Sequence, residues 1–231
     1  MPYESVIVTA LGCAVLGAAL GWWPLAARTA RSLRSPSGRR GSLRTLRIAA
    51  AVVTAATFGA LTARLGATWV LPAVLAFAAG ATVLALVDLI EHRLPNAVVF
   101  PTLAAVAVLL LPASIMAGRP GAFVWALVGA AAMFAVFLLL ALISPGSMGM
   151  GDVKLALLIG LVLGWFGLSA WVIGLLGAFV VGGATSIVAL ATRRVTLRGS
   201  IPFGPSMLAG AVIALLLAGD APSLLGIPAI G

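Results

Sequence analysis

Two aspartates, Asp88 and Asp152, are the residues of this chain best suited to catalysis. The sequence holds only five acidic residues, and these two stand at the ends of long apolar segments. A carboxylate at membrane depth is costly, so such residues usually face the protein interior or a water-filled cavity. Two carboxylates held close together cannot both ionise easily, so one can act as a base while the other stays protonated. Such a pair can activate water to hydrolyse a peptide bond.

Each aspartate also has a plainer interpretation. Asp88 could cap its helix or reach toward the membrane interface. Asp152 follows two glycines, Gly149 and Gly151, and could be the N-cap of the next helix. Either interpretation explains one carboxylate without catalysis, and the sequence alone does not bring the two side chains together.

A metal site is a third possibility at the first aspartate. Asp88, Glu91 and His92 fall at i, i+3 and i+4, which places them on one face of a helix. Charged residues collect at the membrane end of a helix in any case, and the sequence Leu94-Pro95-Asn96 then ends this helix. We therefore expect neither a metal nor an organic cofactor.

The composition places these residues in a membrane protein. Of the 231 residues, 63% are hydrophobic and 8% are charged, against about 45–50% and about 25% in a soluble domain. The net charge of +9 does not indicate a nucleic-acid partner, because the basic residues lie in short stretches between apolar segments. The single cysteine, Cys13, excludes an internal disulfide and a cysteine-rich zinc site.

Eight apolar segments predict an all-α bundle of about eight transmembrane helices. A spanning helix needs about 20 mostly apolar residues, and the sixth segment is shorter than that. The predicted segments are 5–27, 48–63, 69–90, 97–117, 122–143, 153–165, 168–192 and 204–218.

The basic residues predict the orientation of this bundle. Alternating spans put twelve of the fourteen basic residues on the side of segment 28–47 and leave only Arg64 and Arg119 on the other. Cytoplasmic loops are enriched in Lys and Arg, so we expect segment 28–47 and both aspartates at the cytoplasmic face and both termini outside. The first span lacks a basic residue before it, which predicts a retained anchor and not a cleaved signal peptide.

Three short motifs resemble those of the type IV prepilin peptidases, over about residues 70–215. The first is Asp88 followed by Leu94-Pro95-Asn96. The second is Gly149-Met150-Gly151-Asp152-Val153-Lys154-Leu155. The third is Ile201-Pro202-Phe203-Gly204-Pro205, which leads into the last span.

The resemblance implies an integral membrane aspartic endopeptidase in the cytoplasmic membrane of a bacterium. Enzymes of this family remove short basic leaders from prepilin and pseudopilin precursors at the cytoplasmic face, and their two aspartates correspond to Asp88 and Asp152. The resemblance divides the chain into anchor helices and a basic loop at 1–69, a peptidase-like core at 70–218 and a tail at 219–231. The partners expected are the precursor peptides and the lipid bilayer.

Further residues of the three motifs are expected to bind substrate or shape the site. The basic side chain among them, Lys154, stabilises carboxylate charge or holds a substrate carboxylate in one interpretation, and only anchors its helix at the cytoplasmic face in the other. The residues concerned are Pro95, Asn96, Gly149, Gly151, Lys154, Phe203, Gly204 and Pro205.

The chain departs from the family at one place. Many members also N-methylate the new terminus and carry two Cys-x-x-Cys pairs in a cytoplasmic region near the N-terminus. The corresponding segment here, 28–47, contains no cysteine and is short. The resemblance therefore predicts a peptidase without the methyltransferase activity.

Two other classes of protein fit the same aspartates. A proton- or ion-coupled transporter would use them as ligands, but it would show broken helices in repeats with a site near the middle of the membrane. A non-catalytic pilus or secretion assembly protein would use them only to cap helices.

Overall fold

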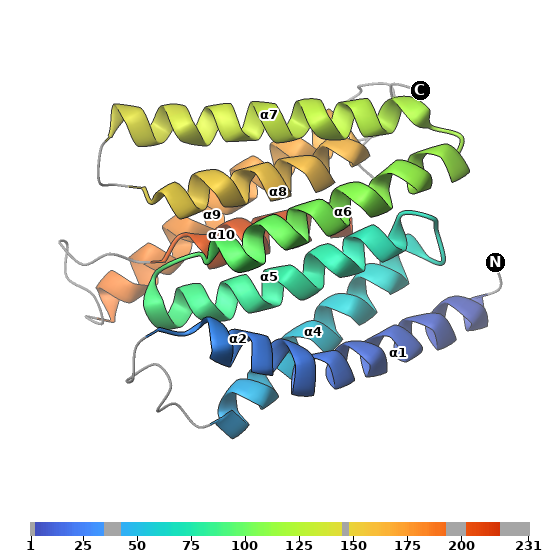
Figure 1. The fold of residues 1–231 in the computed structure, drawn as a ribbon, viewed down its shortest axis with the longest axis horizontal. Coiled ribbons are helices and arrows are strands. Elements are labelled where there is room, and N and C mark those ends of the chain that lie inside the picture. Colours follow the sequence, from blue (N-terminus) through green and yellow to red (C-terminus); the bar gives the residue numbers. More distant parts are fainter. Residues whose placement is uncertain (1–2, 35–42, 145–147, 193–201, 218–231) are drawn as a thin grey trace.

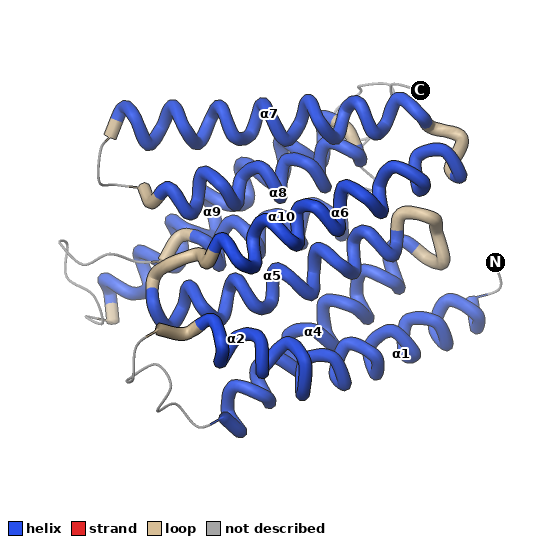
Figure 2. Tube along the Cα trace, viewed as in Figure 1, coloured by secondary structure: helices blue, strands red, loops and turns tan. Residues whose placement is uncertain are grey.

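A computed structural model describes residues 3–34, 43–144, 148–192 and 202–217, and its helices run roughly along one direction (Figure 1). Within these ranges every regular element is a helix and none is a strand (Figure 2). Six helices are long and apolar enough to cross a membrane. The predicted all-α, polytopic membrane bundle is therefore confirmed.

The N-terminal part begins with one long helix of three consecutive pieces. Pro24 lies in its π-helical turn η1, where the wider turn accommodates a residue that cannot donate a backbone hydrogen bond. The pieces are α1 (Tyr3–Leu20), η1 (Gly21–Leu25) and α2 (Ala26–Ser32). The helices that follow are α4 (Leu43–Leu65), α5 (Leu71–Glu91), α6 (Asn96–Met116), α7 (Pro120–Ile143), α8 (Met150–Phe166), α9 (Leu168–Ala191) and α10 (Gly204–Leu217).

Each predicted span has its helix, but the ends differ in two places. The basic segment 28–47 is not a loop throughout, because α2 continues to Ser32 and α4 already begins at Leu43. Arginine favours helices, so basic residues at the ends of apolar segments extend these helices instead of ending them. The centre of this segment, 35–42, and the predicted tail at 219–231 lie outside the described residues.

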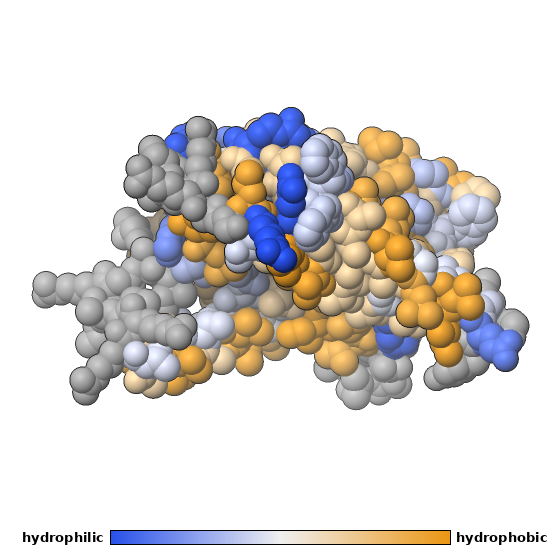
Figure 3. Space-filling view, turned by 90° about the horizontal axis from the view of Figure 1, so that it is seen from below, coloured by the Kyte–Doolittle hydropathy of each residue, from blue (hydrophilic) through white to orange (hydrophobic). Residues whose placement is uncertain are grey.

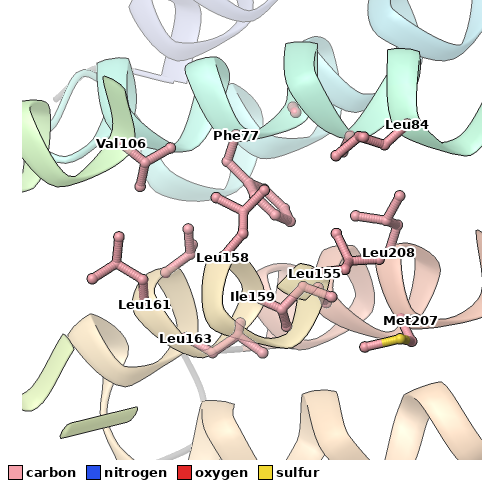
Figure 4. Close-up of a cluster of buried hydrophobic side chains, with 14 of the residues drawn as sticks. Phe77, Leu84, Val106, Leu155, Leu158, Ile159, Leu161, Leu163, Met207 and Leu208 are labelled. Carbon is pink, nitrogen blue, oxygen red and sulfur yellow. The ribbon is translucent and has the colours of Figure 1, made fainter. Parts of the chain in front are cut away.

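Helix α8 lies at the centre of the bundle. Eleven of its 17 residues are buried, and their side chains pack against Phe77 of α5, Val106 of α6 and Met207 of α10 (Figure 4). A helix that is apolar all round belongs in the interior. Helix α5 is also deeply buried. In its most apolar stretch of 18 residues, 67% of the residues are buried, whereas the same share is at most 33% in each of the other five long helices. The two aspartates are thus carried by two of the most deeply buried helices of the bundle.

Helices α7 and α8 approach each other closely through glycine. A Cβ atom added to Gly129 of α7 would lie 2.6 Å from the carbonyl oxygen of Gly160 and 2.8 Å from the Cα of Gly164, both in α8. Small residues allow this contact between backbones, which is a main source of helix association in lipid. The central position of α8 therefore depends on the absence of a side chain at Gly129.

Replacing Gly129 by alanine is expected to lower the free energy of unfolding by about 1–3 kcal/mol, because the new methyl group meets backbone atoms that cannot turn aside. Thermal unfolding of the purified protein in detergent measures the effect. Gly121→Ala is the matched control in the same helix, since a Cβ there meets nothing within 4 Å. Equal unfolding temperatures of the two variants would contradict the close packing of α7 on α8.

Candidate active site

Asp88 is a buried carboxylate at the last turn of α5. Only 4% of its surface is exposed, and its Oδ2 accepts a hydrogen bond of 3.1 Å from the backbone N–H of Gly204 at the start of α10. Helix α5 ends three residues later at Glu91, where His92 takes a left-handed conformation with φ 51° and donates its N–H to the carbonyl of Asp88. The first aspartate is therefore buried and is bound by a backbone group of another helix.

Asp152 lies in the first turn of α8, and the predicted N-cap position is wrong. The helix begins earlier, at Met150, so Gly149 is the N-cap and Asp152 is the third helical residue. From there its Oδ2 accepts a hydrogen bond of 3.2 Å from the N–H of Gly149. A carboxylate in the first turn still offsets the unpaired N–H groups of the helix start, which explains why the local sequence suggested a cap.

The two carboxyl groups come together at one end of the bundle. Asp152 stands ahead of the apolar part of α8 and outside the six candidate spans. Burial, and after it the nearby charge of Asp88, raise the pKa of Asp152 to about 6, although the hydrogen bond from Gly149 acts in the opposite direction. This is the electrostatic relation that two carboxylates sharing one site produce.

Leu94 fills the space between the three motifs. A Cβ atom on Gly151 would lie 3.1 Å from the Cβ of Leu94, and one on Gly204 would lie 3.4 Å from its Cδ2. The turn between α5 and α6 is thus wedged between the starts of α8 and α10. These three segments lie at the same end of the molecule (Figure 1).

The raised pKa of Asp152 predicts a measurable change in stability. The folded protein binds this proton more tightly than the unfolded chain, whose reference pKa is 3.8. The free energy of unfolding therefore falls as the pH rises from about 4 to about 6. At neutral pH the carboxyl group is ionised in both states, so the whole of this loss of stability remains. We expect Asp152→Asn to be more stable than wild type at pH 7, by about 1–2 kcal/mol after a discount for partial exposure.

Thermal unfolding at pH 4 and pH 7 tests this expectation. The gain of the Asp152→Asn variant should be largest at pH 7 and should shrink toward pH 4, where the wild-type carboxyl group is already protonated. A gain that does not depend on pH would mean that the ionisation of Asp152 is not its cause.

Lys154 points to the start of α6. Its Nζ donates a hydrogen bond of 3.2 Å to Oδ1 of Asn96 and lies 6.0 Å from the ring centroid of Phe100. Among the described residues it makes no ion pair with either aspartate. Pro95, the N-cap of α6, has an extended backbone and places Asn96 at the first position of that helix.

Phe203 connects the third motif to the outer helices. Its ring centroid lies 6.3 Å from that of Phe137 in α7 and 5.7 Å from that of Phe179 in α9. A Cβ atom on Gly182 would lie 2.6 Å from the ring. Because Phe203 directly precedes Gly204, this aromatic cluster fixes the backbone N–H that binds Asp88. Sequence reasoning missed Phe137, Phe179 and Gly182, since nothing in their local sequence links them to the motifs.

Glu91 and Arg93, which follow Asp88 in the chain, bind groups other than the two aspartates. Glu91 binds Nε of Arg93 at 2.6 Å and accepts a hydrogen bond from the backbone N–H of Arg34. Arg93 also binds the carbonyl of Ser32 at the end of α2. Among the described residues no group of three or more His, Cys, Asp or Glu could hold a metal ion.

The fold and the site define a class of protein: a polytopic helical membrane protein with two adjacent carboxyl groups at one end of its bundle. Comparison with known proteins gives the family. Residues 75–187, which include both aspartates, match the model of the type IV leader peptidase family. The match includes the first two of the three motifs, and the resemblance predicted from the motifs is confirmed.

A curated relative is similar over most of the chain. It is the prepilin leader peptidase/N-methyltransferase of Bacillus subtilis (strain 168), which is 32% identical over 171 residues. The matched region is 73% of this chain and 64% of the length of that relative. No solved structure matches the chain.

Proposed function

We propose that this protein is an aspartic endopeptidase that removes the leader peptide from type IV prepilin-like precursors. The observation that carries the proposal is the meeting of the Asp88 and Asp152 carboxyl groups at one end of the bundle, where the charge of one raises the pKa of the other. The family of segment 75–187 and the name of the relative support the same activity.

In the proposed mechanism the two carboxyl groups share one proton and hold a water molecule between them. The ionised member takes a proton from the water, which attacks the carbonyl carbon of the scissile peptide bond to give a tetrahedral intermediate. When this intermediate collapses, the C–N bond breaks and the carboxyl group that took the proton gives it to the leaving amine. The protonated member donates a hydrogen bond to the carbonyl oxygen, where negative charge develops. The pair titrates as a unit, and both residues are required in every step.

The remaining motif residues hold this pair in place. The N–H of Gly204 orients the Asp88 carboxylate and the N–H of Gly149 orients that of Asp152. Lys154 and Asn96, which are hydrogen-bonded to each other, tie α8 to α6 beside the pair. We assign Pro95, Gly151, Phe203 and Pro205 to the shape of the site, because they build or pack the turns that carry these groups.

The proposed site opens to the cytoplasm, and both chain ends lie outside. This orientation rests on the basic residues of three segments: the end of α2, the start of α4 and the turn after α5, which carry Arg28, Arg31, Arg44, Arg47 and Arg93. Figure 1 shows these three segments toward the end of the bundle where α5 turns into α6. An excess of basic residues on one side is typical of the cytoplasmic face. A precursor anchored by its own apolar helix would then present its basic leader to the site in the cytoplasmic membrane.

We propose the peptidase activity without the methyltransferase activity named for the relative. Segment 28–47, between the first two spans, contains no cysteine, and the single cysteine of the chain, Cys13, lies in α1. The peptidase core is proposed to cover residues 70–218, with anchor helices and a basic loop before it and a tail at 219–231.

Co-expression with a prepilin from the same genome tests the proposal. The precursor is expected to shorten on a gel, and mass spectrometry of the mature chain should show a new, unmethylated N-terminus. A well-folded protein that leaves prepilins of several leader types intact would instead favour a transporter or an assembly protein. A methylated product formed by the purified protein with a methyl donor would overturn the exclusion of methyltransferase activity.

A further inference from the structure

A small pocket lies on the N-terminal side of the bundle, away from the two aspartates. It encloses about 260 Å³ between the end of η1, helix α2 and the start of α4. This is just below the roughly 300–1,000 Å³ of most ligand pockets, so it suits part of a molecule. Its lining residues are Trp23, Ala26, Ala27, Ala30, Arg31, Leu43 and Arg47.

The lining combines an apolar wall with two cations. Three alanines of α2 leave the space open, and Trp23 and Leu43 add apolar surface. The guanidinium of Arg47 lies 5.2 Å from the ring centroid of Trp23, a cation–π contact that fixes its position at the pocket. The pocket therefore offers positive charge directly beside a surface that excludes water.

Neither cation of the pocket is paired with a carboxylate in the part of the chain that the structure describes. Arg31 and Arg47 make no ion pair with a carboxylate of the described residues, and the hydrogen bond of Arg31 goes to the carbonyl of Ala27 in its own helix. The neighbouring Arg28 is different, because its guanidinium binds the carbonyl of Ala97 and ties α2 to α6. The charge of the pocket is thus left for an external anion.

The pocket lies where two apolar helices meet a basic stretch of the chain. Its basic residues lie at the junction of an apolar helix with the polar end of the molecule, where α2 ends at Ser32 and α4 begins at Leu43. Figure 3, which views the molecule from below, shows hydrophilic residues gathered beside a largely hydrophobic surface. Juxtamembrane arginines attract the anionic lipids of the cytoplasmic leaflet, and guanidinium groups match phosphate oxygens in geometry.

We infer that this pocket binds an anionic phospholipid. Arg31 and Arg47 would hold the phosphodiester group, and the alanine wall with Trp23 would cover the adjoining part of an acyl chain. Such a lipid would join the first span to the second at the end of the bundle that carries the aspartates. The inference does not depend on the proposed peptidase activity, because it concerns a different surface.

The test measures lipid binding to the purified, delipidated full chain. Dihexanoyl-phosphatidylglycerol, dihexanoyl-phosphatidylcholine and glycerol 3-phosphate are titrated below their micellar concentrations, and dissociation constants are read by thermophoresis. We expect the anionic lipid to bind about tenfold more tightly than the zwitterionic one. The free energy of one good charge-assisted hydrogen bond corresponds to a factor of about ten in the dissociation constant. Equal binding of the two lipids would overturn the role of the charges, and equally tight binding of glycerol 3-phosphate would overturn the role of the acyl chain.

Variants connect the binding to the pocket. The double variant Arg31→Gln/Arg47→Gln is expected to weaken binding of the anionic lipid about tenfold or more, whereas Arg44→Gln is expected to leave it unchanged. Arg44 is the matched control because it is exposed on the same turn of α4 and does not line the pocket. Ala30→Leu keeps both charges but fills the pocket, and it should weaken binding as well. Unchanged affinity in the double variant or in Ala30→Leu, with unfolding temperatures like wild type, would refute the site.

Discussion

Replacing Asp88 or Asp152 by asparagine is expected to abolish leader cleavage. Each change removes the proton exchange of one carboxyl group, and general acid–base catalysis is worth about 10²–10⁴ in rate. Both groups act in the same step, so we expect each single variant to lose activity as completely as the double variant. The measurement is the initial rate of cleavage of a purified prepilin by detergent-solubilised protein.

A third carboxylate serves as the matched control for these changes. Glu4 lies in the first turn of α1 and is exposed, so Glu4→Gln removes a charge without touching the site and should cleave at the wild-type rate. Because Asp152→Asn is expected to be more stable than wild type at neutral pH, a loss of activity in that variant cannot come from unfolding. Wild-type cleavage by either aspartate variant would remove that residue from the mechanism.

Gly204→Ala is expected to lower kcat about a hundredfold. A Cβ atom at this position would lie 2.6 Å from Oδ2 of Asp88, so the alanine must push the carboxylate away from the N–H that binds it. A displacement of about 1 Å in a reacting group can cost a factor of this size. The KM for the precursor should change little, because substrate contacts outside the carboxyl pair remain. Alanine is otherwise favourable in a helix, so the effect isolates this one contact.

Gly183→Ala is the control for this second experiment. It lies in α9, and an added Cβ there meets nothing within 4 Å, so kcat should equal that of the wild type. Gly182→Ala, one residue earlier, should lower kcat by less than Gly204→Ala does. Its Cβ would displace the ring of Phe203, which directly precedes Gly204. A normal kcat in Gly204→Ala would show that the bond from Gly204 is not needed to hold Asp88.

The helices themselves were predictable from local sequence, because a run of about 20 apolar residues has few alternatives to a membrane helix. Their ends were predicted less well. Arg28 and Arg31 were expected in a loop but lie in α2, because charge marks the membrane boundary and does not end a helix. One interpretation put Asp152 at the N-cap, but it is the third residue of α8, because Gly149 takes the extended conformation of the cap.

The sequence by itself determined the class of the fold and, through its motifs, the resemblance to the type IV leader peptidase family. Tertiary structure alone decided that α8 is central, that Gly204 reaches Asp88 across 116 residues and that Phe137, Phe179 and Gly182 support this contact. The physical reason is that membrane helices are apolar on every side, so hydrophobic periodicity does not say which faces meet. Close backbone contacts at small residues such as Gly129 decide the neighbours of each helix, and with them which carboxyl groups lie together.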